Sequence, residues 1–131
     1  MQEIEQVFRR VRDCFIWQSD KDTYGIAEYW NDFAENVLTG KVTSGDCEDF
    51  ALTCLIVGIR EHGFAPEKCR IARVLTEIGN RNLPFDHAVA IYDGQVLDNR
   101  QRGVVPISYL NHYRFYDYCR IPITEWYRYD T

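Results

Sequence analysis

Residues 44–51 read Ser44-Gly45-Asp46-Cys47-Glu48-Asp49-Phe50-Ala51, and they place a cysteine where a glycine-led turn meets the start of an apolar helix. The first turn of a helix presents unpaired backbone N–H groups and the positive end of the helix dipole. Both favour a negatively charged sulfur over a neutral thiol. Cys47 is therefore a candidate nucleophile. The alternative is a structural cysteine, because free cysteines are among the most buried residue types.

The helix that follows Cys47 is predicted to lie at the centre of the domain, because apolar residues continue around nearly all of its sides as far as Ile59. The segment 60–63, Arg-Glu-His-Gly, is typical of a helix C-terminus. Upstream, apolar residues at helical spacing predict two further helices, over residues 2–17 and 26–38.

The second half of the chain has the pattern of strands. Alternation from Cys69 onward predicts one strand, and residues 87–92 and 95–99 predict two more around a hairpin turn at Asp93-Gly94. Residues 119–129 predict a further strand. Helices followed by an antiparallel sheet indicate an α+β fold. The length of 131 residues indicates a single domain, residues 1–131.

Composition excludes several classes of protein. Hydrophobic residues make up 46% of the chain and charged residues 27%, which argues against disorder. The net charge is −5 and no basic cluster is visible, so we expect no nucleic-acid partner, and the tyrosine- and arginine-rich segment 109–129 is interpreted as a sheet with one wet face. Without an apolar spanning run or a signal-peptide pattern, we expect a cytoplasmic protein with no membrane partner.

The five cysteines are odd in number and irregular in spacing, which favours reduced thiols over a disulfide framework. The chain contains no Cys-x-x-Cys, His-x-x-x-His or His-Glu-x-x-His motif, so a structural zinc site has little support.

The predicted hairpin supplies partners for a nucleophilic cysteine. With the turn centred on Asp93-Gly94, His87 faces Arg100, and Asp98 occupies the same face as a diagonal neighbour of His87. Diagonal pairs lie roughly 7 to 8 Å apart at the backbone, within reach of a carboxylate accepting from an imidazole N–H. A cysteine hydrolase needs a thiolate, a histidine and a group that orients the histidine. Singly, the histidine and the aspartate also suit structural roles, but their joint occurrence favours catalysis.

The chain resembles a known family at these positions. The segment 45–51, then His87-Ala88-Val89 and Leu97-Asp98-Asn99, are similar to the bacterial transglutaminase-like cysteine proteinases over about residues 24 to 110. The resemblance implies a papain-like fold, in which a central helix bearing the cysteine packs on an antiparallel sheet. Members of the family include periplasmic proteases that cut adhesins and small versions in phage genomes, and this short chain resembles the phage type.

The resemblance also implies roles for individual residues. Cys47 corresponds to the nucleophile, His87 to the general base and acid, and Asp98 to its orienting partner. Trp30 corresponds to a family tryptophan that lines the substrate cleft, with a place in the core as the alternative. The backbone N–H of Cys47 would donate to the oxyanion.

The acids around Cys47 have two interpretations. They should raise the pKa of the thiol, so something must offset their charge. Asp46 suits a helix N-cap, and acids in the first turn suit the dipole. In the adhesin-cleaving relatives, calcium binds the acids that flank the cysteine, here Asp46 and Glu48. Two side chains alone make a weak calcium site, so capping is the favoured interpretation.

The leading hypothesis is a thiol hydrolase, a cysteine peptidase that acts on peptide or side-chain amide bonds of a protein substrate through an acyl-enzyme, with no cofactor required for the chemistry. A transglutaminase or deamidase would use the same three residues. A non-catalytic protein-binding domain on the same fold is the alternative from another class. A zinc site of Cys47, His87 and Asp98 is the third interpretation.

Overall fold

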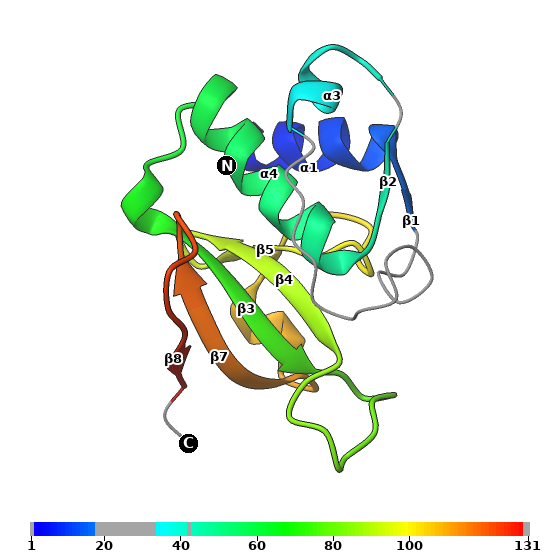
Figure 1. Cartoon of the computed structure of the whole chain (residues 1–131), viewed down its shortest axis with the longest axis vertical. Helices are drawn as coiled ribbons and strands as arrows, with labels where there is room; N and C mark the ends of the chain where they lie inside the picture. Colours follow the sequence, from blue (N-terminus) through cyan, green and yellow to red (C-terminus); the bar gives the residue numbers. More distant parts are fainter. Residues whose placement is uncertain (1, 18–33, 42, 130–131) are drawn as a thin grey trace.

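The computed structural model describes residues 2–17, 34–41 and 43–129, and it confirms the α+β fold (Figure 1). The helices are α1 (Gln2–Cys14), α3 (Ala34–Leu38) and α4 (Cys47–Glu61), with short 3-10 helices η1 (Pro66–Lys68) and η2 (Ile107–Leu110). The main sheet is antiparallel with strand order β6-β5-β4-β3-β7-β8. Its strands are β3 (Cys69–Leu75), β4 (His87–Tyr92), β5 (Gln95–Leu97), β6 (Val105–Pro106), β7 (Arg114–Arg120) and β8 (Tyr127–Arg128).

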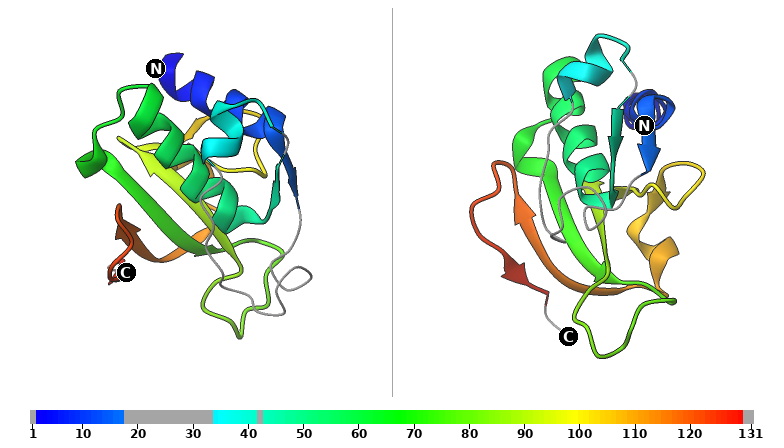
Figure 2. Two further views of the ribbon diagram at one scale, coloured as in Figure 1. Left: turned by 45° about the horizontal axis from the view of Figure 1, so that its top comes forward. Right: turned by 45° about the vertical axis from the view of Figure 1, so that its right-hand side comes forward.

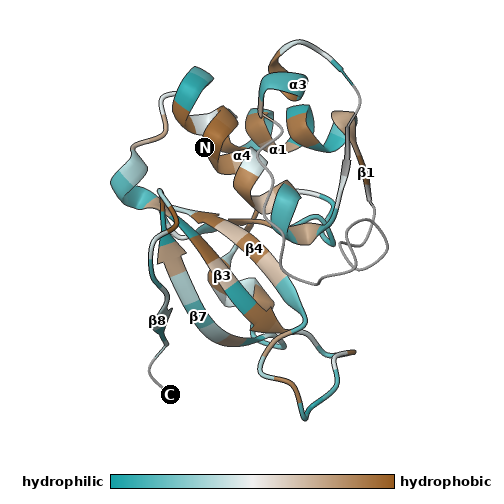
Figure 3. Ribbon diagram, in the orientation of Figure 1, coloured by the Kyte–Doolittle hydropathy of each residue, from teal (hydrophilic) through white to brown (hydrophobic). Residues whose placement is uncertain are grey.

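Helix α4 lies at the centre of the core, as its apolar pattern predicts. It contacts β4, α1 and α3, and Figure 2 shows the three helices gathered at one side of the sheet. Most of its side chains are buried, and Figure 3 shows hydrophobic residues along both α4 and the central strands. The helix ends where predicted, since the N–H of His62 donates to Gly58 O at 3.0 Å and Gly63 has a φ of +73°.

The opposite face of the sheet is covered by a second apolar cluster. Leu110 of η2 and Tyr113 pack against residues of β3, β4 and β5 that point away from α4. The short helix is visible behind β3 and β4 in Figure 1. Strand residues of the sheet therefore alternate between two apolar environments, which explains why β3 and β4 are almost entirely buried.

The predicted first helix is too long. Helix α1 ends at Cys14, and the next residues form strand β1 (Phe15–Trp17), which pairs in parallel with β2 (Thr43–Gly45). Aromatic and β-branched residues suit a strand, and a pairing partner nearly thirty residues away outweighs the local helical spacing. This small sheet leads directly into the turn before Cys47.

Two other boundaries differ from prediction. Strand β5 ends at Leu97, because Asp98 and Asn99 turn away from the ladder. The predicted strand over residues 119–129 is divided between β7, which begins at Arg114, and β8. Of the predicted helix over residues 26–38, only Ala34–Leu38 falls within the described residues. None of the described helices has the length and apolar character needed to cross a membrane.

A close approach between α4 and the following loop explains Gly58. A Cβ atom at this position would lie 2.1 Å from Cδ2 of Phe64, whose ring stacks on Tyr92 with centroids 3.9 Å apart. Replacing Gly58 by alanine should therefore destabilise the protein by about 1–3 kcal/mol through overpacking, although alanine is the better helix former. Chemical denaturation measures this free energy.

The matched control is the same substitution in a Phe64→Ala background, where the added methyl group has room. There Gly58→Ala should cost little or increase stability. An equal cost in both backgrounds would contradict the packing explanation.

Candidate active site

Cys47 is the first residue of α4, and a reciprocal set of hydrogen bonds defines this helix start. Asp46 Oδ1 accepts from the N–H of Glu48 at 3.0 Å and of Asp49 at 3.2 Å, while Asp49 Oδ2 accepts from the N–H of Asp46 at 3.2 Å. This capping box satisfies two N–H groups of the first turn and fixes the direction in which the helix leaves the loop. The capping interpretation of Asp46 is therefore confirmed.

Gly45 makes the capping box sterically feasible. A Cβ atom on Gly45 would lie 2.7 Å from Oδ2 of Asp49 and 3.0 Å from the ring of Phe15. Any side chain at this position would displace the carboxylate that closes the box. The capping box thus accounts for three residues of the Gly-Asp-Cys-Glu-Asp motif, namely Gly45, Asp46 and Asp49.

His87 and Asp98 meet on the β4–β5 hairpin. The observed register pairs Ala90 with Leu97 and Tyr92 with Gln95, as the Asp93-Gly94 turn predicts. His87 Nε2 lies 2.7 Å from Asp98 Oδ1, and both side chains are buried. An ionised carboxylate can only accept, so Nε2 carries a proton, and in the tautomer that this bond selects the lone pair of the imidazole lies on Nδ1.

Three further donors hold the Asp98 carboxylate. Tyr113 donates its hydroxyl to Oδ2 at 2.7 Å, the N–H of Arg100 donates to Oδ1 at 3.0 Å, and Gln101 Nε2 donates to Oδ2 at 3.2 Å. Burial alone would raise the pKa of Asp98, but hydrogen bonds from His87, Arg100 and Tyr113 outweigh it and lower this pKa below its usual value. Asp98 is therefore a fixed anion at neutral pH.

Tyr113 is the member of this site that sequence reasoning missed. Its hydroxyl stays protonated, because burial and the hydrogen bond to Asp98 raise the pKa of Tyr113. The residue lies just beyond η2, in a loop with no local pattern that predicts a partner. A buried tyrosine does require a hydrogen-bond acceptor, which is the only signal that the sequence offered.

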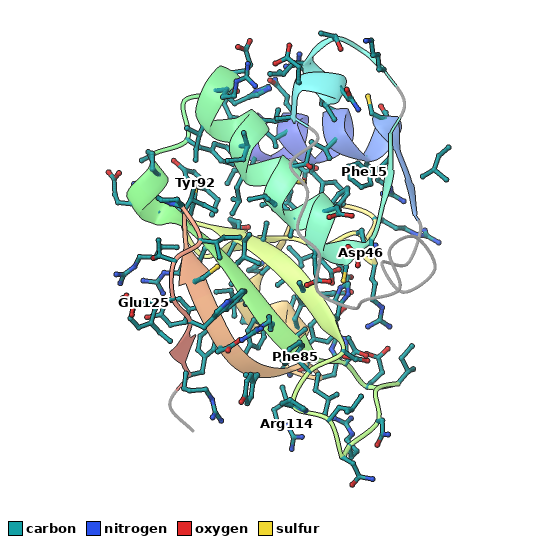
Figure 4. All side chains as sticks on the ribbon, viewed as in Figure 1. Phe15, Asp46, Phe85, Tyr92, Arg114 and Glu125 are labelled. Carbon is teal, nitrogen blue, oxygen red and sulfur yellow. The ribbon has the colours of Figure 1, made fainter. Side chains whose placement is uncertain are left out.

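Cys47 and His87 line the same cleft, which has a volume of about 400 Å³. Figure 4 marks Asp46 at the start of α4 and Phe85 near the loop that joins β3 to β4, and Phe85 also lines the cleft. The backbone N–H of Ala88, the residue after His87, donates toward the sulfur of Cys47. The N-terminus of α4 therefore meets the start of β4, and the thiol lies beside the strand that carries the histidine.

The thiol of Cys47 is protonated in this arrangement. Burial raises its pKa well above the usual value, the charges of Asp46, Glu48 and Asp98 raise it further, and the Ala88 N–H opposes them. The acids of the motif thus have the electrostatic effect expected from the sequence. A neutral thiol must lose its proton before it attacks, which requires a nearby base.

The described residues do not form a metal site. Nowhere in the described part of the chain do three or more His, Cys, Asp or Glu side chains group so that they could hold a metal ion. Asp46 Oδ1 already accepts two backbone N–H groups, and calcium requires six to eight oxygen ligands. Asp46 and Glu48 alone do not fit calcium, and Cys47, His87 and Asp98 do not fit zinc. Trp30, the expected cleft residue, lies outside the described residues.

The protein has the architecture of papain-like thiol enzymes. In this architecture a cysteine begins the central helix, and a hydrogen-bonded histidine and its partner lie on the adjacent hairpin. The model of the family described as bacterial transglutaminase-like cysteine proteinase, BTLCP, matches residues 1–122. The chain belongs to this family, whose members are cysteine proteases.

Solved structures of LapG from Legionella pneumophila have the same fold. The calcium-bound and EGTA-treated forms each superpose with a TM-score of 0.71 at 20% sequence identity. The match covers 99% of this chain and 69% of the calcium-bound chain, or 67% of the EGTA-treated one. Among curated proteins, no match was found.

Replacing Tyr113 by phenylalanine should raise the pKa of Asp98, because the hydroxyl hydrogen bond that stabilises the carboxylate is lost. Because the pKa of Asp98 is lower in the folded state than in the unfolded chain, where it is about 3.9, its ionisation stabilises the fold above that pH. This stabilisation is lost as the pH falls through the pKa of the folded state. Acid unfolding of Tyr113→Phe should therefore begin at a higher pH than that of the unaltered protein. At pH 7 the substitution should lower the free energy of unfolding by about 2 kcal/mol. Tyr109→Phe, at an exposed tyrosine of η2, is the control. It should change neither the pH at which acid unfolding begins nor the free energy of unfolding at pH 7.

Asp46 combines a cap with a charge, and two substitutions separate them. Asparagine caps as well as aspartate, so Asp46→Asn should keep the free energy of unfolding within about 0.5 kcal/mol, whereas Asp46→Ala should lose about 1 kcal/mol. Both remove the charge that raises the pKa of Cys47. The pH profile of Cys47 alkylation should move to lower pH by about one unit in each variant. A profile unmoved by Asp46→Asn would argue against the electrostatic effect.

Proposed function

We propose that this chain is a thiol hydrolase that cleaves peptide or side-chain amide bonds of a protein substrate, with Cys47 as nucleophile, His87 as general base and acid, and Asp98 as the orienting group. The observation that carries the proposal is the buried 2.7 Å hydrogen bond from His87 to Asp98, beside a cleft that also contains Cys47. A histidine held in this tautomer has its unprotonated Nδ1 available to accept a proton from a thiol.

The first half of the reaction forms a thioester. His87 takes the proton of the Cys47 thiol as Sγ attacks the carbonyl carbon, which gives a tetrahedral intermediate with a negative oxygen. The N–H of Cys47 belongs to the first turn of α4, where backbone N–H groups have no partner within the helix, and it would donate to this oxygen. The intermediate then expels the amine, which leaves with the proton from His87.

The second half returns the enzyme to its starting state. A water molecule gives a proton to His87 and attacks the thioester carbon. The carbon–sulfur bond breaks, the carboxylic acid product leaves, and Cys47 regains its proton. Asp98 remains ionised throughout and stabilises the imidazolium that forms in each half.

Because the pKa of Cys47 is raised, its reactivity near neutral pH should depend on His87. Iodoacetamide should modify Cys47 faster than the fully buried Cys54, Cys69 and Cys119. His87→Ala should slow the reaction at Cys47 by about 100-fold, the usual contribution of a general base. Mass spectrometry of the digested protein gives the rate at each cysteine.

His112→Ala is the matched control, because His112 lies outside the cleft with a half-exposed side chain and should leave the rate unchanged. Cys47→Ser should abolish cleavage of a protein substrate such as unfolded casein while the fold is kept. Equal modification rates at Cys47 and the buried cysteines, or no cleavage by the unaltered protein, would favour a non-catalytic binding domain. Unchanged cleavage by Cys47→Ser would overturn the role of Cys47 as nucleophile.

A further inference from the structure

We infer that the loop between β3 and β4, residues 76–86, forms an apolar subsite that binds an uncharged apolar side chain of the protein substrate next to the reacting bond. The inference rests on the proposed function, because the subsite is defined by its position beside Cys47 and His87. It adds a substrate class, which the catalytic residues alone do not specify.

The subsite is continuous with the candidate active site. One wall of the 400 Å³ cleft consists of Cys47, His87 and Ala88, and another consists of the loop residues Leu83, Pro84 and Phe85. A substrate whose carbonyl carbon reaches Cys47 must therefore place a neighbouring group against this loop. The group that covers these apolar loop residues is therefore part of the substrate itself.

The wall presents apolar surface to solvent. Leu83 is 48% exposed, although leucine side chains are usually covered in a folded protein. Single exposed leucines are common, but this one stands at the rim of a cleft together with Pro84 and Phe85. A bound apolar side chain would remove this surface from water, which favours binding.

The loop is held in place before any substrate binds. Asp86 accepts two hydrogen bonds from Thr76, from the backbone N–H and from the hydroxyl, each at 2.8 Å. The N–H of Asp86 donates to Val74 O at 2.9 Å. Gly79 allows this closure, because a Cβ atom there would lie 2.5 Å from Oδ2 of Asp86. A wall ordered in advance loses little conformational entropy on binding.

The charged groups that line the cleft already have protein partners. Arg73 Nε donates to Asp117 at 2.8 Å, and its guanidinium lies over the rings of Phe85 and Trp126, at 4.4 and 3.8 Å from their centroids. The Asp86 carboxylate is occupied by Thr76. Buried Glu48 adds a negative charge beside Cys47, which disfavours an acidic side chain. Among the described residues, the cleft thus offers contact area to an apolar group and a negative charge that disfavours an acidic one.

Three alkylating probes with the same reactive carbon test the subsite: iodoacetamide, N-benzyl iodoacetamide and iodoacetylglycine. In each case the cysteine sulfur displaces iodide. The rate at Cys47 is divided by the rate at glutathione, which removes differences in intrinsic reactivity. The benzyl probe should show a ratio about tenfold above that of iodoacetamide, and the acidic probe a ratio below it.

Variants of the same loop locate the effect. Leu83→Ser should remove most of the advantage of the benzyl probe, and Leu83→Met should retain it. Ile78→Ser is the matched control, since Ile78 is 79% exposed on the same loop but does not line the cleft. Both serine variants change surface residues, so each should keep the fold.

Two failures are distinguishable. If iodoacetamide modifies Cys47 rapidly but the benzyl probe has no advantage, or if Ile78→Ser removes the advantage as Leu83→Ser does, the subsite is overturned and the proposed hydrolase stands. If iodoacetamide itself fails to modify Cys47 faster than the buried cysteines, the proposed function is overturned and the subsite with it.

Discussion

The hydrogen bond between His87 and Asp98 depends on the register of one hairpin. The turn residues Asp93 and Gly94 both have positive φ, 51° and 81°, and this pair of conformations favours a tight two-residue connection whose twist matches that of the strands. Asp98 and His87 lie on the same face as Val89 and Val96, and a slip of one residue would move Asp98 to the opposite face, among the apolar residues that pack against α4. Geometry at the turn therefore determines whether the histidine has an anionic partner.

Electrostatics around Cys47 favour a mechanism in which the proton moves during attack. The carboxylates that build the helix start also raise the pKa of the thiol, and Asp98 adds to the same effect. A resting thiolate is disfavoured in such a field, whereas a thiol beside a fixed imidazole is not. The same carboxylates therefore have two effects. They stabilise the start of α4, and their charge makes the Cys47 thiol harder to deprotonate.

The sequence predicted the parts of the site that local rules control. The dipeptide Asp93-Gly94 determined the register that brings His87 to Asp98, and the apolar pattern after Cys47 predicted a central helix. Tyr113 was missed because its contact with Asp98 depends on how the loop after η2 folds back under the sheet. Strand β1 was missed because helical spacing continues through it, and only its distant partner β2 identifies it. Contacts of this kind depend on tertiary packing, which no local pattern encodes.

The most direct test of Cys47 as a nucleophile is to look for the acyl-enzyme itself. After rapid mixing with p-nitrophenyl acetate and acid quench, mass spectrometry would determine which cysteine carries the acetyl group and for how long. If Cys47 is the nucleophile and His87 the base, an acetyl thioester should form on Cys47 and then hydrolyse to free thiol, with both steps slowed in His87→Ala. An acetyl group spread equally over Cys47 and Cys14, or one that persists on Cys47 in the unaltered protein, would contradict these roles.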